Sequence, residues 1–462
     1  MKLIKIALVI GLTASLSSCH IYKKYETPTS TAITKEYAEA LKQPTDSTAF
    51  GNLAWQDVFT DPILVDLINR ALVANTDLRN AQLNVEAAQA QLLGAKLAYL
   101  PSLAIAPNGA GSRFGNRYTD GSWSWSYQLP AQASWEVDIF GKLLNSKRGA
   151  KAALLQSEAY AQAVRSQIIS AVATTYYTLA SVKQQLSLSR NTSALWLETV
   201  EKMRDLKLAG RTNEAGVMQS EANYYNILGS ITDLEASVDR LNNTMSLLLN
   251  TMPQEWAVSE NAVLLAPENA RNGVAMATLA ARPDVAAAEQ SLAQAYYATN
   301  SARAAFYPGL TISVNGGFTN ALGSAILNPG DWFVQLAGSL VAPIFSRGRN
   351  IANLKAAKAS QQKAMNSFEY TLMNAAAEVS DALTVYQKSQ EKSVFLDKQV
   401  EDLSKAVDMT QDLFTYSNGD VNYLNVITAQ QSLLSAQISR IACSQAASLA
   451  VINLYQSMGG GR

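Results

Sequence analysis

The sequence predicts a mixed, mainly α fold in which one module is used twice: helix, strand, strand, long helix, helix. Three observations predict it. The chain is self-similar at an offset of about 207 residues, long proline-free segments have helical periodicity, and other segments alternate apolar and polar residues. A chain with these features has a repeated architecture that combines long rods with two-faced strands.

Composition excludes several classes of function. The 462 residues include 37 Lys or Arg, 37 Asp or Glu and a single histidine, His20. Balanced charge argues against a nucleic-acid partner, which usually selects a basic excess. Catalytic triads, Cys–His pairs and His-based zinc sites all need a well-placed imidazole. We therefore predict no enzyme activity, no catalytic residue, no metal site and no cofactor apart from a covalent lipid.

The N-terminal segment has the features of an export signal. Two lysines precede the apolar residues 6–16, which are too few to span a bilayer. The run Leu16-Ser17-Ser18-Cys19 resembles the bacterial lipobox, in which a peptidase cuts before a cysteine that carries lipid. We predict a signal peptide over residues 1–18, lipidation at Cys19, and an N-terminal anchor and extended segment over 19–60. An ordinary signal peptide with an incidental cysteine is the alternative.

The internal repeat is carried by anchors that recur in the same order. The segment Asn75-Thr76-Asp77-Leu78 matches Arg282-Pro283-Asp284-Val285, and residues 98–103 match residues 305–310. The predicted organisation is a first repeat over residues 61–250, an equatorial segment over 251–272, a second repeat over 273–456 and a tail over 457–462.

Each repeat contains a pair of amphipathic strands. Residues 123–139 have apolar or aromatic side chains at all odd positions and mainly polar ones at even positions. Residues 310–319 also alternate, with the apolar side chains and a glycine at even positions. The strands are predicted at about 102–139, with the first over 103–114, and at about 309–345. Such strands suit a barrel with lipid outside and water inside. A sheet packed on a soluble core is the alternative.

The remainder of each repeat is predicted to be helical. Residues 141–249 and 346–455 form a long and a shorter helix in each copy, with glycine-containing breaks at 209–216 and 417–422. Apolar residues in the long helices step by three and four, and many are alanine, so these rods pack closely against other helices.

Closure of the sheet predicts the oligomeric state. Four strands cannot close a barrel, and an open sheet edge is not tolerated in hydrocarbon. Two copies would give eight strands, whose interior is filled by side chains, whereas three give twelve and leave a lumen. We therefore predict a homotrimer with a 12-stranded transmembrane β-barrel and a long periplasmic α-helical barrel.

Several short motifs occur in a recognisable order along nearly the whole mature chain. They are the lipobox at Cys19, Trp55-Gln56-Asp57-Val58-Phe59-Thr60-Asp61-Pro62, Ala280-Ala281-Arg282-Pro283-Asp284-Val285, Phe306-Tyr307-Pro308, Pro343-Ile344-Phe345 and Tyr416-Ser417-Asn418-Gly419. In this order and spacing the sequence resembles the TolC-like outer membrane efflux protein family, specifically its lipoprotein branch of OprM, CusC and NodT type.

The resemblance implies an outer membrane channel of a tripartite efflux system that exports small molecules. It implies a periplasmic adaptor protein and an inner-membrane pump of RND type as partners. It also implies a lipid-anchored protein in the outer membrane of a Gram-negative bacterium, in contact with outer membrane lipid and extending into the periplasm. The alternatives are the outer component of type I protein secretion and a lipid-anchored periplasmic coiled-coil scaffold.

The resemblance also assigns residues near the helix turns. Tyr416, Leu424 and Thr428 are expected at the periplasmic aperture, and Gly210 and Gly419 in the turns that contact the adaptor. Thr428 stands where many family members have an acidic residue, so a ring of carboxylates that attracts cations is not expected there. Tyr416 and Leu424 have the alternative role of seam residues between helices.

Overall fold

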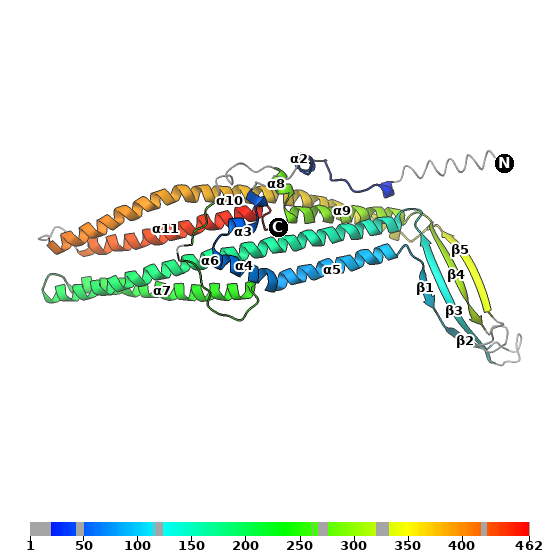
Figure 1. Ribbon diagram of the computed structural model, residues 1–462, viewed down its shortest axis with the longest axis horizontal. Helices are drawn as coiled ribbons and strands as arrows, with labels where there is room; N and C mark the ends of the chain where they lie inside the picture. The colour runs from blue at the N-terminus through cyan, green and yellow to red at the C-terminus, as the bar shows by residue number, and fades with distance from the viewer. Residues whose placement is uncertain are drawn as a thin grey trace. The chain divides into compact units, whose positions relative to one another are not determined.

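A computed structural model describes residues 20–42, 50–113, 115, 123–260, 262–266, 276–319, 332–416 and 423–461 (Figure 1). The predicted signal peptide, Cys19 and Gly419 lie outside these residues.

Helices make up most of the described chain (Figure 1). The helical elements are η1 (His20–Tyr22), α2 (Ala32–Ala40), η2 (Phe50–Asn52), α3 (Trp55–Val58), α4 (Pro62–Ala74), α5 (Thr76–Leu97), α6 (Lys142–Leu208), α7 (Glu214–Leu248), α8 (Met276–Ala280), α9 (Pro283–Ala304), α10 (Arg349–Tyr416) and α11 (Tyr423–Ser457). The prediction of an extended segment over 19–60 is wrong in part, because α2 and α3 form there.

The same order of elements occurs in both halves of the chain. Helices α5 and α9 have 22 residues each, α6 and α10 have 67 and 68, and α7 and α11 have 35 each. Strands lie between α5 and α6 in the first half and between α9 and α10 in the second half. The long helices begin and end within a few residues of the predicted positions.

The periodic positions of the long helices form their buried faces. In α6, Ile168, Val172 and Leu179 are buried, and in α10, Phe368 and Val379 are buried. Spacings of three and four place these side chains on one side of each helix, where neighbouring helices cover them. The predicted packing faces are therefore confirmed.

The chain divides into two compact units. Unit 1 comprises Met1–Pro28, Asn84–Glu158 and Ala287–Glu369, and unit 2 comprises Thr29–Leu83, Ala159–Ala286 and Tyr370–Arg462. Unit 1 contains the sheet and the helical segments adjoining it, whereas unit 2 contains the described parts of the helix turns. Each unit takes segments from both predicted repeats.

A single antiparallel sheet lies in unit 1 (Figure 1). Its strands are β1 (Ser102–Ile105), β2 (Asn108–Arg113), β3 (Trp123–Val137), β4 (Gly309–Thr319) and β5 (Trp332–Val341). Strands β1 and β2 both pair with β3, β3 pairs with β4, and β4 pairs with β5. The ladder between β3 and β4 joins strands from the two predicted repeats.

The expected continuous strand over 103–114 is wrong, because it is interrupted between β1 and β2. Pro107 lies in the interruption and has no N–H to donate to the ladder. One bond bridges the gap, since the Ala106 N–H donates to the Pro130 carbonyl over 3.1 Å. The two short strands therefore act as one broken partner of β3.

The register separates the sheet into one apolar and one polar face. On the apolar face, β3 residues Leu129, Ala131, Ala133, Trp135 and Val137 pair with β4 residues Phe318, Gly316, Val314, Ile312 and Leu310. On the polar face, Gln128, Gln132, Ser134 and Glu136 pair with Thr319, Asn315, Ser313 and Thr311. Paired residues point to the same side of a sheet, so the predicted alternation continues across neighbouring strands.

Two further features concern single segments. Within the described residues, no helix combines the length and the apolar composition that a membrane span requires. Cys443 is a buried free thiol on α11, and its Sγ lies 3.3 Å from the Ser389 carbonyl oxygen. It therefore acts as a packing residue.

Candidate functional site

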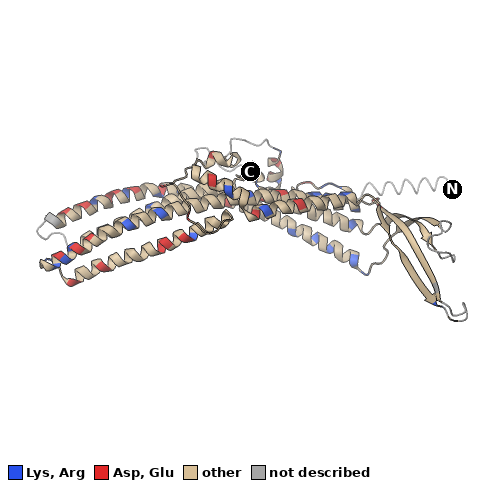
Figure 2. Ribbon diagram, turned by 60° about the horizontal axis from the view of Figure 1, so that its bottom comes forward, with Lys and Arg blue, Asp and Glu red and all other residues tan. Residues whose placement is uncertain are grey.

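The apolar face of the sheet is open to solvent in the isolated chain. Val334 and Leu336 of β5 are 66% and 73% exposed, and Trp123 and Trp125 of β3 stack with their ring centroids 5.9 Å apart. Figure 2 shows the strands almost without charged residues. An exposed apolar surface of this extent marks a surface that contacts lipid or another protein.

Aromatic residues also gather at the opposite end of the strands. Phe140 and Tyr307 stack with their centroids 4.9 Å apart, and the Trp135 indole N–H donates to the Tyr99 carbonyl over 2.9 Å. Ten residues separate Trp125 from Trp135, which is about 33 Å along a strand. A tilt of about 40° reduces this to a height of about 25 Å, the height of the apolar band of outer membrane barrels.

The segment that follows Cys19 is bound to unit 1. The Asn145 side chain donates to the Ile21 carbonyl over 2.6 Å, and the Arg148 guanidinium donates to the Tyr22 carbonyl over 2.9 Å. The Tyr22 hydroxyl donates to the Ile139 carbonyl, just beyond the end of β3. These contacts hold residues 21–22 beside the end of the sheet at which the aromatic residues gather.

The turn between α6 and α7 is a Schellman motif. Gly210 has φ +70°, its N–H donates to the Lys207 carbonyl, and the Arg211 N–H donates to the Leu206 carbonyl. Glycine suits this left-handed position because it has no Cβ. Asn213 then caps α7 by accepting from the Gly216 N–H over 3.1 Å. Backbone groups at the end of α6 and at the beginning of α7 thus have hydrogen-bond partners, so the turn has a well-defined conformation.

The beginning of α11 packs beside this turn. Ile427 is buried in one cluster with Met203 of α6 and Val217 of α7. A groove of about 600 Å³ separates the turn from α11, and its lining includes Gly210, Leu424 and Ile427. Gly210 and Leu424, which the sequence assigned to different roles, therefore border the same groove.

The remaining predicted tip residues are placed as follows. Leu424 is 56% exposed, and the Thr428 hydroxyl donates to the Leu424 carbonyl over 2.8 Å. Tyr416 is the last residue of α10, but its side chain and the whole of Gly419 lie outside the described residues. The aperture assignments of Tyr416, Leu424 and Thr428 therefore stay predictions.

Asp61 gives a structural role to the motif around Trp55. It caps α4 by accepting from the amides of Ile63 and Leu64, and it accepts the Tyr176 hydroxyl of α6 at 2.7 Å. Burial opposes its ionisation, but these hydrogen bonds and one with Ser259 outweigh burial and hold the Asp61 pKa below its usual value. Through Asp61, the motif thus holds the beginning of α4 against α6.

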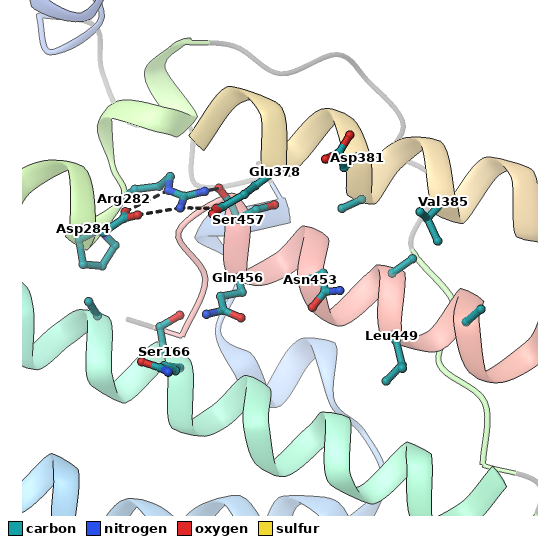
Figure 3. Close-up of a pocket in the computed structure, with 16 residues that line it drawn as sticks. Ser166, Arg282, Asp284, Glu378, Asp381, Val385, Leu449, Asn453, Gln456 and Ser457 are labelled. Carbon is teal, nitrogen blue, oxygen red and sulfur yellow. Dashed lines mark hydrogen bonds and ion pairs between the residues drawn. The ribbon is translucent and has the colours of Figure 1, made fainter. Parts of the chain in front are cut away.

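Arg282 connects three helices in unit 2 (Figure 3). Its side chain is 7% exposed and forms ion pairs with Asp284 at 2.7 Å and Glu378 of α10 at 2.6 Å. It also donates to the Ser457 carbonyl at the end of α11 over 2.7 Å. Burial lowers its pKa, yet hydrogen bonds and charge from the two carboxylates raise it overall. The guanidinium is thus held charged where α9 begins.

A pocket of about 750 Å³ opens beside this cluster and is lined by Asp381, Asn453 and Gln456, among others. The sequence identified Arg282 and Asp284 only as part of a motif and did not identify Glu378. Among the described residues, no group of three or more His, Cys, Asp or Glu side chains is arranged to hold a metal ion.

Comparison with known proteins gives consistent matches over most of the chain. The family described as outer membrane efflux protein matches residues 67–251 and 274–460. The cation efflux system protein CusC of Escherichia coli strain CFT073 is 28% identical over 417 residues, covering 89% of each chain. The probable outer membrane lipoprotein SilC of Salmonella typhimurium is 26% identical and covers 100% of this chain and 99% of its own.

Solved structures agree. The open state of the Neisseria gonorrhoeae MtrE outer membrane channel has a TM-score of 0.79 at 25% identity, covering 95% of this chain and 97% of its own.

The exposed apolar face generates the first prediction. Val334 lies near mid-height on the apolar face, whereas its neighbour Gln335 pairs with Asn315 on the polar face. Val334→Arg should lower the yield of membrane-assembled protein, because a cation on the lipid face costs about 2–4 kcal/mol at the midplane. Gln335→Arg should assemble like wild type. Equal yields in isolated outer membranes would contradict a lipid-facing sheet.

The second prediction concerns Arg282. Arg282→Ala removes a buried cation and leaves two half-exposed carboxylates, so we expect a loss of about 2–3 kcal/mol in the free energy of unfolding. Arg440→Ala is the control, because Arg440 pairs with Asp397 in a far more exposed position and should change stability by less than about 1 kcal/mol. Thermal unfolding of the purified variants measures both, and similar shifts would argue against a structural role for the Arg282 cluster.

Proposed function

The chain belongs to the outer membrane efflux protein family, and from this premise we propose that three copies form one duct that carries small molecules across the outer membrane. The protein is the outer membrane component of an efflux system. One observation carries the proposal: a sheet with a lipid-suited face, a water-suited face and two unpaired edges.

The edges require partners. Among the described residues, β5 pairs only with β4, and β1 and β2 pair only with β3. Unpaired backbone N–H and C=O groups are costly in hydrocarbon, so β5 of one copy pairs with β1 and β2 of the next. Counting β1 and β2 as one broken strand, each copy contributes four strands and three copies contribute twelve. Twelve strands enclose a lumen lined by the polar face.

The groove beside Gly210 is the proposed contact for a periplasmic adaptor. It is bounded by the turn between α6 and α7 and by the beginning of α11. A partner that enters it would therefore touch helices from both repeats of one copy. Such a partner could couple outward movement of α11 to pumping. The pump is proposed to be of RND type, as the resemblance to the lipoprotein branch of the family implies. Small solutes are the proposed cargo.

Leu424 is the proposed constriction. It is exposed at the beginning of α11, and the hydroxyl of Thr428 is already engaged by the Leu424 carbonyl. If three copies bring Leu424 towards one axis, the ring is apolar, and a narrow apolar pore resists wetting. Tyr416 is proposed at the same aperture, and Gly419, like Gly210, is proposed as an adaptor contact.

Lipid on Cys19 is the proposed second anchor. The contacts of Asn145 and Arg148 hold residues 21–22 beside the end of the sheet. A lipid chain on a cysteine two residues earlier in the sequence would therefore be attached within reach of the bilayer. Because the sheet itself spans the membrane, lipid assists assembly and is not the main attachment.

Lipidation is tested with labelled fatty acid. Label should enter the wild-type protein and not Cys19→Ala, and the assembled variant should stay in membranes washed with carbonate because the sheet anchors it. Cys443→Ala is the matched control and should keep the label. A Cys19→Ala protein that washes off would contradict an integral sheet.

The duct is tested by conductance of purified protein in planar bilayers. We expect a trimer that survives unheated electrophoresis and conducts weakly, and Leu424→Ser should raise single-channel conductance several-fold without weakening the trimer. Gln132→Ala, on the polar face of β3, should leave conductance almost unchanged. A monomer without conductance would refute the duct, and a Leu424→Ser channel identical to wild type would place the constriction elsewhere.

A further inference from the structure

The helical segments of unit 1 are unusually basic. Residues 84–100, 142–158, 287–305 and 347–369 contain eleven Lys or Arg and four Asp or Glu. Figure 2 shows these cations, in blue, on the helices next to the sheet. The whole chain has no net charge, so the excess in this unit is a local feature.

Five of these cations lie close to the strand ends and are called the basic collar here: Lys96, Lys142, Lys147, Arg347 and Arg349. Lys142 and Arg349 are the first residues of α6 and α10, and Lys96 is in the last turn of α5. At 1.5 Å per residue, even Lys147 lies only about 8 Å along its helix. The collar therefore fits within a headgroup layer of about 5–8 Å beside the hydrocarbon.

The collar has little internal compensation. Lys142 pairs with Glu136 at 2.8 Å, and the Lys147 ammonium lies 4.9 Å from the Tyr99 ring centroid. Lys96, Arg347 and Arg349 form no ion pair with a described residue. The nearby Asp138 carboxylate is engaged, because it accepts from two amides at the beginning of α6.

Helix dipoles do not explain the collar. A cation in the last turn of a helix is favourable, which accounts for Lys96. Lys142 and Arg349 stand instead at helix N-termini, and Arg347 lies two residues before the beginning of α10. The partial positive charge at a helix N-terminus disfavours cations. These positions cost helix stability. Glu136 and Asp138 compensate this cost at α6, whereas at α10 an anionic partner outside the chain would offset the repulsion on Arg347 and Arg349.

The neighbouring residues identify the partner as a membrane surface. Between the sheet and the collar, Ile344 and Phe345 are 98% and 84% exposed, and Phe306 and Tyr307 are also exposed. At the boundary between hydrocarbon and headgroups, membrane proteins typically have aromatic residues, with exposed cations farther from the hydrocarbon. A soluble anionic partner would not explain the exposed apolar residues.

We propose that the basic collar binds the phosphate groups of anionic phospholipids in the periplasmic leaflet of the outer membrane. The proposal rests on the membrane placement of the sheet in the proposed function. Each cation near an anionic surface strengthens association about fivefold. The collar thereby fixes the depth of the sheet in the bilayer and favours assembly where anionic lipid is present.

The test uses the full-length protein in nanodiscs of phosphatidylcholine with or without phosphatidylglycerol. Phosphatidylglycerol should raise the thermal transition of wild type and remain bound in native mass spectra. Arg347→Gln with Arg349→Gln should weaken retention of this lipid at least tenfold. Lys388→Gln with Lys398→Gln removes two cations from α10 that are paired with carboxylates far along the helix, and it should retain the lipid like wild type.

Channel conductance of the same preparations separates the two proposals. Wild type that conducts but does not distinguish the two lipids would overturn the collar alone, and wild type that does not conduct would refute the duct. A collar variant that keeps its lipid but changes the preference of the channel for anions over cations would show that the cations line the lumen, which also overturns the proposal. Unheated electrophoresis verifies that each variant assembles.

Discussion

Hydrogen bonding at the edges of one sheet governs the rest of this molecule. The β1/β2 and β5 edges carry backbone groups that hydrocarbon cannot satisfy, although the apolar face of the same strands is suited to hydrocarbon. A single copy therefore combines a surface that favours insertion with edges that forbid it. In the proposed trimer, pairing of these edges between copies removes the conflict, and oligomerisation would then be part of folding in the membrane. In the proposed barrel, the aromatic residues at both ends of the strands would limit how far the closed sheet can move along the membrane normal.

The duplication is visible in the contacts as well as in the order of elements. Asn75, before α5, accepts from two amides of that helix and donates to the Leu248 carbonyl at the end of α7. Arg282 stands at the matching place before α9 and donates to the Ser457 carbonyl at the end of α11. The first repeat thus uses a neutral amide where the second uses a cation, and only the second needs Asp284 and Glu378 to compensate a charge. Equivalent contacts between helices are therefore made by an amide in the first repeat and by a guanidinium in the second.

Local patterns predicted the parts of the fold that depend on local periodicity. The bounds of α6, α10 and β3 follow from steps of three and four and from alternation, which side chains dictate along one element. The interruption at Pro107 was missed, although the proline itself gave the signal, because it cannot donate to the ladder. Contacts such as Arg282 with Glu378, 96 residues away, and Asn145 with Ile21, 124 residues away, could not be predicted, since they depend on which helices become neighbours. Among the site residues, the same reason left the groove shared by Gly210 and Leu424 unpredicted.

The polar face of the sheet also bears on where selection takes place. Across β3, β4 and β5 it presents mainly amides and hydroxyls, among them Gln132, Asn315 and Gln335, with Glu136 as an acidic member that is paired with Lys142. Neutral amides and hydroxyls can both donate and accept hydrogen bonds, so they discriminate weakly between cations, anions and neutral solutes. As the wall of the proposed duct, such a face would admit solutes of all three kinds. In the proposed duct, control of passage would therefore fall to the groove between the α6–α7 turn and α11, and to the partner that delivers the solute.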